Sequence, residues 1–163
     1  MGLSLEYIEG QTPIEEDEKE GLLIKTISTR GELDEFEQVS IQEAVEWSMR
    51  RKFTKDQILT EDFILLVHKR MFDSVWDWAG KKRKTNKNIG VDKTQITVEI
   101  RKLLDDCRFW IENNTFQPDE IAIRFSHRFV KIHVFPNGNG RHSRLPEFIF
   151  LSGRDKKPNL NDL

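Results

Sequence analysis

One segment organises the rest of this chain, residues 133 to 144, which read His133-Val134-Phe135-Pro136-Asn137-Gly138-Asn139-Gly140-Arg141-His142-Ser143-Arg144. Before it, apolar residues recur at helical spacing from Pro118 onward, which predicts a buried helix ending near His133. A second apolar run begins at Arg141, so the segment should be a loop between two helices. Pro136 and the two glycines prevent a continuous helix across it.

The same segment has the composition of an anion-binding loop. Gly138 and Gly140 remove side chains where the backbone must approach a ligand closely, and the N–H groups that begin the second helix face the same concavity. Arg141 and Arg144 share one face of that helix's first turn, where a cation is unfavourable unless an anion is bound beside it. His133 can accept a proton near neutral pH, which transfer of a phosphorus group to a hydroxyl requires. The pattern therefore predicts a polyphosphate site with a general base.

These residues resemble the signature of the Fic (filamentation induced by cAMP) family, usually written H-P-F-x-[D/E]-G-N-G-R-x-x-R. Two positions depart from it, since Val134 stands in place of proline and Asn137 in place of the acidic residue. A second segment, which begins at Trp76, is similar to the W-x-W-A-G-x-x-R segment of Fic domains. The signature positions that agree are His133, Phe135, Gly138, Asn139, Gly140, Arg141 and Arg144.

The resemblance implies a protein adenylyltransferase, because family members typically move AMP from ATP to a Ser, Thr or Tyr hydroxyl of a target protein and release pyrophosphate. His133 would be the general base for that hydroxyl, and Phe135 the apolar anchor of the loop. Asn137 would hold Mg²⁺ or Mn²⁺ with the phosphates, although an amide brings no negative charge and favours Mg²⁺ less than an acid does. The implied nucleotide-binding residues are Gly138, Asn139 (including its side chain), Gly140, Arg141 for the β-phosphate and Arg144 for the γ-phosphate.

Many Fic proteins are inhibited by a helix with the pattern [S/T]-x-x-x-E-[G/N], whose glutamate pairs with the second arginine of the signature. Residues 39–44 are weakly similar to that pattern and would make Glu43 the inhibitory partner of Arg144. The alternative, an ordinary surface glutamate, stays open. If the pairing exists, replacing Glu43 with glycine should raise activity and ATP affinity.

Residues 80–97 are interpreted as the flap of Fic domains, a short β-hairpin whose open edge takes up a segment of the target protein. The interpretation rests on extended residues on either side of a polar turn, after a basic run over residues 81–87. Lysines commonly protect an exposed strand edge, and the chain as a whole is slightly acidic. We therefore favour a protein partner at this place over nucleic acid.

Apolar periodicity predicts further helices over residues 32–49, from Thr60 through Met71, and over residues 96–111. For the first of these, the expected inward residues include Phe36 and Met49. The fold class is therefore all-α, a Fic-like helical bundle with one short β-hairpin. We divide the chain into an extended N-terminal segment, residues 1–30, and a single Fic domain, residues 31–163, with the candidate inhibitory helix over residues 31–52.

Composition restricts the class of protein. The 163 residues carry a formal net charge of −2, which gives no general bias towards nucleic acid or membranes. The single cysteine, Cys107, fits a reducing compartment and a packing role, and no apolar leader or membrane-length run occurs, so we expect a cytoplasmic protein. Fic domains usually continue with more helix after the signature that contributes to the adenine pocket. Little chain remains here, so we expect either a shortened domain or completion by another subunit.

Two alternatives to adenylyl transfer stay open. A Doc-like kinase toxin turns the nucleotide around and phosphorylates its target; Asn137 resembles that family's loop, whereas Gly138 and Arg141 agree with AMP transfer. A catalytically weakened nucleotide-binding module would bind ATP without modifying anything. The sequence also leaves open whether a separate antitoxin or the chain's own helix restrains activity, and whether the chain forms a homodimer.

Overall fold

The computed structural model describes residue 3, residues 5–6 and residues 13–152. In these residues the regular structure is helical, and the one β-type pairing is an isolated antiparallel bridge between Leu22 and Trp76. The all-α class is thus confirmed. The elements are α1 (Glu16–Lys19), α2 (Arg30–Met49), α3 (Lys55–Ile58), α4 (Glu61–Phe72), the 3₁₀ turn η1 (Lys93–Gln95), α5 (Ile96–Glu112), α6 (Pro118–Ile132) and α7 (Asn139–Ser152).

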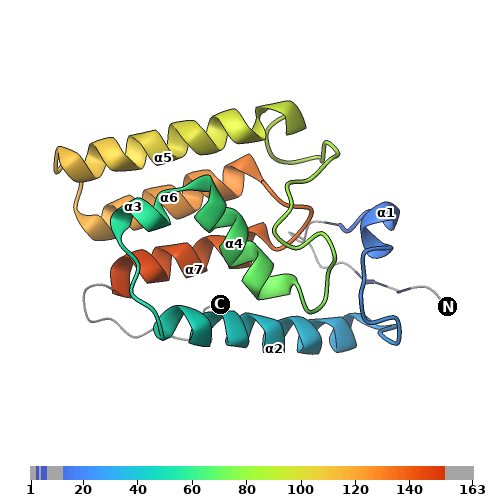
Figure 1. Ribbon diagram of the computed structural model, residues 1–163. Coiled ribbons are helices and arrows are strands. Elements are labelled where there is room, and N and C mark those ends of the chain that lie inside the picture. Colours follow the sequence, from blue (N-terminus) through green and yellow to red (C-terminus); the bar gives the residue numbers. More distant parts are fainter. Residues whose placement is uncertain (1–2, 4, 7–12, 153–163) are drawn as a thin grey trace.

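The helices stack in a bundle with α2 and α5 on opposite outer sides and α4, α6 and α7 between them (Figure 1). Helix α6 packs against both α5 and α7, while α4 packs against α2 and α7. One hydrophobic cluster joins α2 and α4, a second joins α5 and α6, and α7 contributes residues to the first. The loop between α6 and α7, residues 133–138, therefore lies at one end of the bundle, where α2 also begins.

Helix α2 lies where a helix was predicted, but it buries a different face from the one expected. Thr29 caps it by accepting a hydrogen bond from the N–H of Glu32, and the Glu32 carboxylate accepts one from the Thr29 N–H. Phe36 and Met49, expected to face inward, are 45% and 57% exposed. The buried stripe falls at helical spacing on other positions, and three of those positions are polar. These buried residues are Leu33, Glu37, Ser40, Ile41, Ala44, Val45 and Ser48.

The other predicted helices are confirmed. Thr60 caps α4 by accepting from the N–H of Phe63 at 3.1 Å, and α6 ends at His133 as expected. Helix α5 buries Cys107, and burial raises the pKa of that thiol to about 12, which agrees with a packing role. None of the described helices has the length and apolar character needed to cross a membrane.

The predicted hairpin is not present among the described residues. Residues 80–92 instead form an irregular loop, in which two backbone N–H groups bond to the end of α6 and to the loop that follows it. The Arg83 N–H donates to the Val134 carbonyl at 2.9 Å, and the Val91 N–H donates to the Ile132 carbonyl at 3.3 Å. The Arg83 side chain, only 3% exposed, donates to the carbonyls of His133, Thr85 and Val91.

Most of the cationic side chains of residues 81–87 also have partners within the chain. Lys82 pairs with Glu61, and Lys87 pairs with Glu18 at 2.9 Å with both side chains almost fully buried. Together with Arg83, three of the five cations of residues 81–87 thus have partners within the chain. These contacts also show that the N-terminal part is not simply extended: from residue 13 onward it includes α1 and adds Ile14, Leu22 and Ile27 to the core.

Candidate functional site

The loop between α6 and α7 is shaped by its own backbone and by Asn139. Helix α6 stops because His133 takes a left-handed conformation, with φ 56° and ψ 64°. The Asn139 side chain then accepts from the Phe135 N–H and donates to the Phe135 carbonyl, both at 2.9 Å. From the resemblance we expected the Asn139 side chain to hold the phosphates. In the structure this side chain is buried and stabilises the loop through its two bonds to Phe135.

His68 on α4 supports the loop from beneath and was not identified as a site residue from the sequence. Its ring is fully buried and stacks on Phe135, with 3.6 Å between ring centroids. Its Nδ1 accepts from the Gly80 N–H at 2.9 Å, so its Nε2 must carry the proton and donate to the Asn137 carbonyl at 3.0 Å. Burial, assisted by His142, keeps the His68 pKa well below its ordinary value, and the ring is therefore neutral.

The two glycines of the signature differ in their structural roles. Gly138 has φ +78°, and a Cβ there would lie 2.7 Å from the Phe72 ring, so both the backbone conformation and the packing require glycine. Gly140 lies in the first turn of α7, and a Cβ there would meet nothing within 4 Å. The absence of a side chain at Gly140 therefore leaves room for a ligand and does not relieve a clash.

His133 has the properties of a proton acceptor. The residue is 4% exposed, and its Nε2 has no hydrogen-bond partner within the described chain. Burial, and after it the positive charges of Arg83 and Lys87, lower its pKa to about 4. At neutral pH the imidazole is thus uncharged and has a nitrogen lone pair available.

A cavity of about 710 Å³ brings most of the predicted residues together. Phe135 is not among its lining residues because it is buried below the loop. Three residues from the first turns of α2 also line the cavity, and they were not predicted from the sequence. Among them, Arg30 Nε and Asp34 Oδ1 form an ion pair at 2.9 Å. The cavity is lined by Arg30, Asp34, Gln38, Ile89, Val130, His133, Asn137, Gly138, Asn139, Gly140, Arg141 and Arg144.

Glu43 is not part of this cavity. It is exposed and lines a separate hollow with Trp47, Arg50 and Arg70, so the proposed pairing with Arg144 is wrong for this structure. A different glutamate of α2 contacts the signature: Glu37 Oε2 accepts from Arg141 Nη1 at 2.6 Å. Glu37 and Glu43 are six positions apart, which corresponds to about 1.7 helical turns and puts their side chains on different faces.

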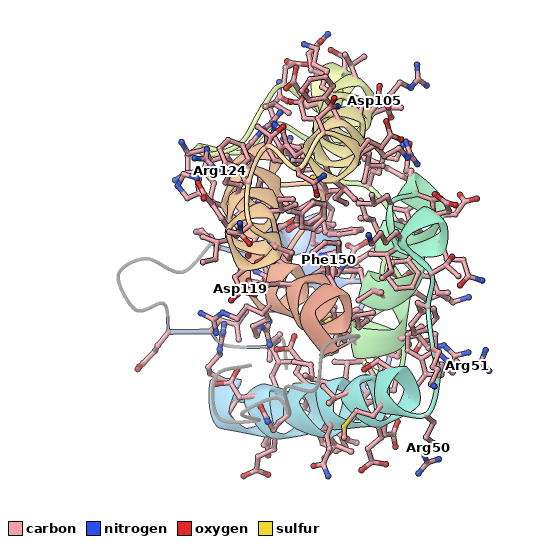
Figure 2. All side chains as sticks on the ribbon, turned by 90° about the vertical axis from the view of Figure 1, so that its left-hand side faces the viewer. Arg50, Arg51, Asp105, Asp119, Arg124 and Phe150 are labelled. Carbon is pink, nitrogen blue, oxygen red and sulfur yellow. The ribbon has the colours of Figure 1, made fainter. Side chains whose placement is uncertain are left out.

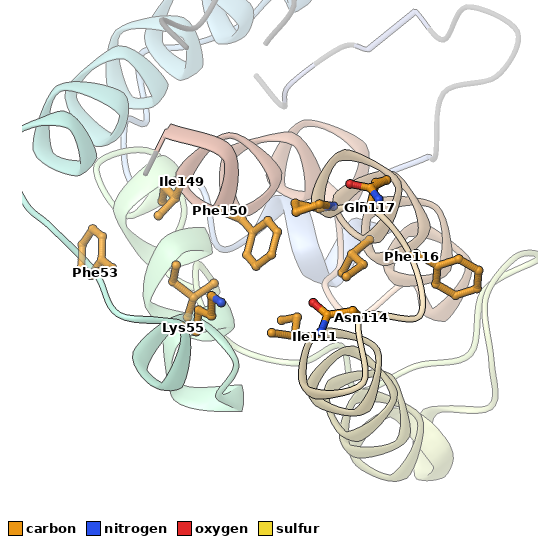
Figure 3. A pocket seen from close by; sticks show the side chains of 11 residues that line it. Phe53, Lys55, Ile111, Asn114, Phe116, Gln117, Ile149 and Phe150 are labelled. Atoms are coloured by element: carbon orange, nitrogen blue, oxygen red, sulfur yellow. The ribbon is translucent and has the colours of Figure 1, made fainter. Parts of the chain in front are cut away.

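A second hollow of about 370 Å³ lies at the other end of the bundle. Figure 2 looks onto that end, where Phe150 lies between the helices while Arg51, Asp105 and Arg124 point outward. Figure 3 shows the hollow from close by, with Phe53, Ile149 and Phe150 among the side chains around it. No residue of the 133–144 segment lines it, so it is not the predicted phosphate site.

The donor groups around the α6–α7 loop suit an anion better than a protein-held metal ion. The Asn137 side-chain oxygen, the predicted metal ligand, accepts from the Gly138 N–H at 2.7 Å. The described residues contain no group of three or more His, Cys, Asp or Glu side chains placed to hold a metal ion. The first turn of α7 offers N–H groups without intrahelical acceptors, next to two guanidinium groups.

This combination of a helical bundle with a glycine-containing loop, a helix N-terminus and two arginines defines a class of protein built around an anion site. The model of the Fic/DOC family matches residues 58–151, more than half of the chain, and the chain belongs to that family. Its members are commonly AMP or nucleotide transferases. No curated protein matches the sequence.

Several solved structures share the fold. The N-terminal Fic domain of a VirB-translocated Bep effector protein from Bartonella quintana matches with a TM-score of 0.69 and 18% identity, over 86% of this chain and 73% of that one. BepC from Bartonella tribocorum, with bound AMPPNP, matches with a TM-score of 0.68 and 18% identity, over 85% of this chain and 80% of that one. A Bartonella quintana Fic domain with bound ADP matches with a TM-score of 0.64 and 16% identity, over 78% of this chain and 69% of that one.

Proposed function

We propose that this chain is a protein adenylyltransferase, which transfers AMP from ATP to a hydroxyl of a target protein. The observation that supports the proposal most directly is a neutral His133, with a buried Nε2 that has no partner among the described residues, in the lining of the same cavity as the first turn of α7, Arg141 and Arg144. A proton acceptor and a polyphosphate cradle on one cavity suit an attack of a hydroxyl on phosphorus. The nucleotides present in two similar Fic structures agree with it.

In the proposed reaction the target oxygen attacks the α-phosphorus of ATP. The new O–P bond forms as the bond between the α-phosphorus and the bridging oxygen breaks, and the electron pair leaves with pyrophosphate. His133 Nε2 takes the hydroxyl proton. The backbone N–H groups at Gly140 and Arg141 face the charge that develops on the phosphates, and Arg141 and Arg144 balance the charge of the leaving group.

We propose further that Mg²⁺ or Mn²⁺ enters as the complex with ATP, held mainly by the phosphates, because Mg²⁺ in such sites keeps several waters and few protein ligands. The acceptor hydroxyl would reach His133 beside Ile89 and Val130, which line the same cavity and are 47% and 38% exposed. Both side chains offer an apolar contact to a peptide segment.

Intact mass after incubation with ATP and Mg²⁺ or Mn²⁺ tests the proposal, with AMPPNP binding measured in parallel by calorimetry. We expect AMPPNP to bind and the chain to gain the mass of AMP. A gain of the mass of phosphate would instead identify a kinase. Binding without any gain in mass would favour a nucleotide-binding module, and no binding at all would overturn the proposal.

Exchanging each signature glycine for alanine should separate fold from ligand binding. Gly138→Ala should lower the free energy of unfolding by about 2–4 kcal/mol, because a left-handed backbone and the Phe72 ring both oppose a Cβ. Gly140→Ala should change stability by no more than about 1 kcal/mol, since its Cβ meets open space and alanine favours helix. Yet it should weaken AMPPNP binding about tenfold by obstructing the approach to the N–H groups, a loss of about 1.4 kcal/mol. Urea unfolding and calorimetry measure the two effects; equal AMPPNP affinity of Gly140→Ala and the unaltered chain would place the phosphates elsewhere.

A further inference from the structure

Helix α2 buries a carboxylate directly behind the cavity. Glu37 is 3% exposed, whereas the other glutamates of α2 are exposed. A charged side chain is almost never buried to this degree unless it is paired and hydrogen-bonded. The position therefore calls for a specific partner on each carboxylate oxygen.

Each oxygen of Glu37 has such a partner. Oε1 accepts from Trp76 Nε1 at 2.8 Å, and Oε2 accepts from Arg141 Nη1 at 2.6 Å. Trp76 is itself 1% exposed and stacks on Trp78 with 4.8 Å between ring centroids, so one oxygen is fixed by the core. A carboxylate fixed in this way has little freedom to turn away from Arg141.

Arg141 is held on its other side by an aromatic ring. Its guanidinium carbon lies 4.9 Å from the centroid of the Phe72 ring, the ring that also packs against Gly138. Glu37 takes one of the five N–H donors of a guanidinium, which leaves the remaining edge for a ligand in the cavity. The negative charge of Glu37 also offsets the unfavourable placement of a cation at the start of a helix.

We propose that Glu37 is a positioning residue that orients Arg141 towards the phosphates of the bound nucleotide; this inference rests on the proposed function. Trp76 acts through Glu37, because its Nε1–H holds the Oε1 of that carboxylate. The contact is not a blocking one, because Trp76 holds the carboxylate in the core and Glu37 is not among the residues that line the cavity.

Only a carboxylate satisfies both donors. In Glu37→Gln the amide NH₂ group would face either Trp76 Nε1–H or Arg141 Nη1–H, and one of the two bonds would be lost. Arg141 would then lose its fixed orientation and would have to be ordered by the ligand. An inhibitory or purely electrostatic carboxylate predicts the opposite, since removing a negative charge beside an anion site should tighten binding.

AMPPNP binding by calorimetry distinguishes these outcomes. We expect Glu37→Gln to weaken binding about tenfold, and Trp76→Phe, which keeps a ring in the core but removes the donor to Oε1, to weaken it about threefold. Glu43→Gln, on the same helix but outside the cavity, is the matched control and should bind as the unaltered chain does.

A double-mutant cycle separates positioning from a merely structural role. In an Arg141→Ala background, Glu37→Gln should cause no further loss of AMPPNP affinity, because the residue through which it acts is absent. A structural role would instead lower the melting temperature and leave the affinity of the folded protein unchanged. Equal or tighter AMPPNP binding by Glu37→Gln and Trp76→Phe overturns the inference alone. Absence of binding by the unaltered chain overturns the proposed function, and the inference with it.

Discussion

His133→Ala should lower the rate of AMP transfer by about 10²–10⁴-fold, the usual contribution of a positioned general base. AMPPNP affinity should change by no more than about twofold, because His133 is assigned to the acceptor hydroxyl and not to the phosphates. Intact mass over time gives the rate, and calorimetry gives the affinity. His127→Ala is the matched control, since that imidazole lies on the same helix, is exposed and does not line the cavity.

The pH dependence of the rate tests the same assignment in a second way. The pKa of His133 is lowered to about 4, so the base form persists as the pH falls from 7 to about 5 and is lost only around pH 4. The rate should therefore stay level down to about pH 5. A fall centred near the ordinary histidine pKa of about 6.5 would show that His133 is more solvated in the working enzyme than in this structure. A His133→Ala chain that still gains AMP at the full rate would remove His133 from the mechanism.

The parts of the fold that were predictable from the sequence are those governed by local pattern. Helices α4, α5 and α6 carry apolar residues at a spacing of three to four and appear where the pattern indicates; α4 also has a capping threonine and α6 a first-turn proline. Residues 133–144 likewise specify their own loop, because Gly138 needs φ +78° and Asn139 bonds only four residues back. Such information lies within a few residues of sequence.

The errors concern contacts between distant residues. Residues 88–96 alternate as a hairpin would, but Val91 bonds to the last residue of α6 and Arg83 to the loop that follows it. These long-range bonds override a weak local β-preference. Glu37 and Glu43 are chemically identical, and the two partners of Glu37, Trp76 and Arg141, are 39 and 104 residues away. A signal for Glu37 was nevertheless present: it lies four residues from Leu33 and four from Ile41, both inward-facing, so it falls on the buried stripe.

The same signal, a polar residue on the buried stripe of a helix, identifies His68. Replacing His68 should have a large effect on stability. On α4 it follows Val67 and lies four residues after Ile64, both fully buried, so an unpaired imidazole there would be costly. His68→Ala should lower the free energy of unfolding by about 3–5 kcal/mol, because it removes a buried ring stacked on Phe135 together with its hydrogen bonds to the Gly80 N–H and the Asn137 carbonyl. For a chain of this length that corresponds to a fall in Tm of roughly 10 °C.

His68→Phe separates the ring from its hydrogen bonds. It keeps the stack on Phe135 and removes the bonds to the Gly80 N–H and the Asn137 carbonyl, so about 1–3 kcal/mol should be lost with these two buried hydrogen bonds. Thermal unfolding of His68→Ala, His68→Phe and the exposed control His127→Phe gives the comparison. A His68→Phe chain as stable as the unaltered one would show that the two bonds contribute nothing.

The effect of low pH on stability should also depend on His68. The folded-state pKa of His68 is well below the unfolded value of about 6.5, so the unfolded chain binds the extra proton first and stability falls as the pH drops below 6.5. His68→Phe should lessen this loss, whereas His127→Phe should not.

Because His68 binds the Asn137 carbonyl, His68→Phe should also loosen the turn that ends in Gly138 and weaken AMPPNP binding at a pH where the chain is still folded. Unchanged AMPPNP affinity would confine His68 to the core and leave the shape of the phosphate loop to Asn139 and Gly138.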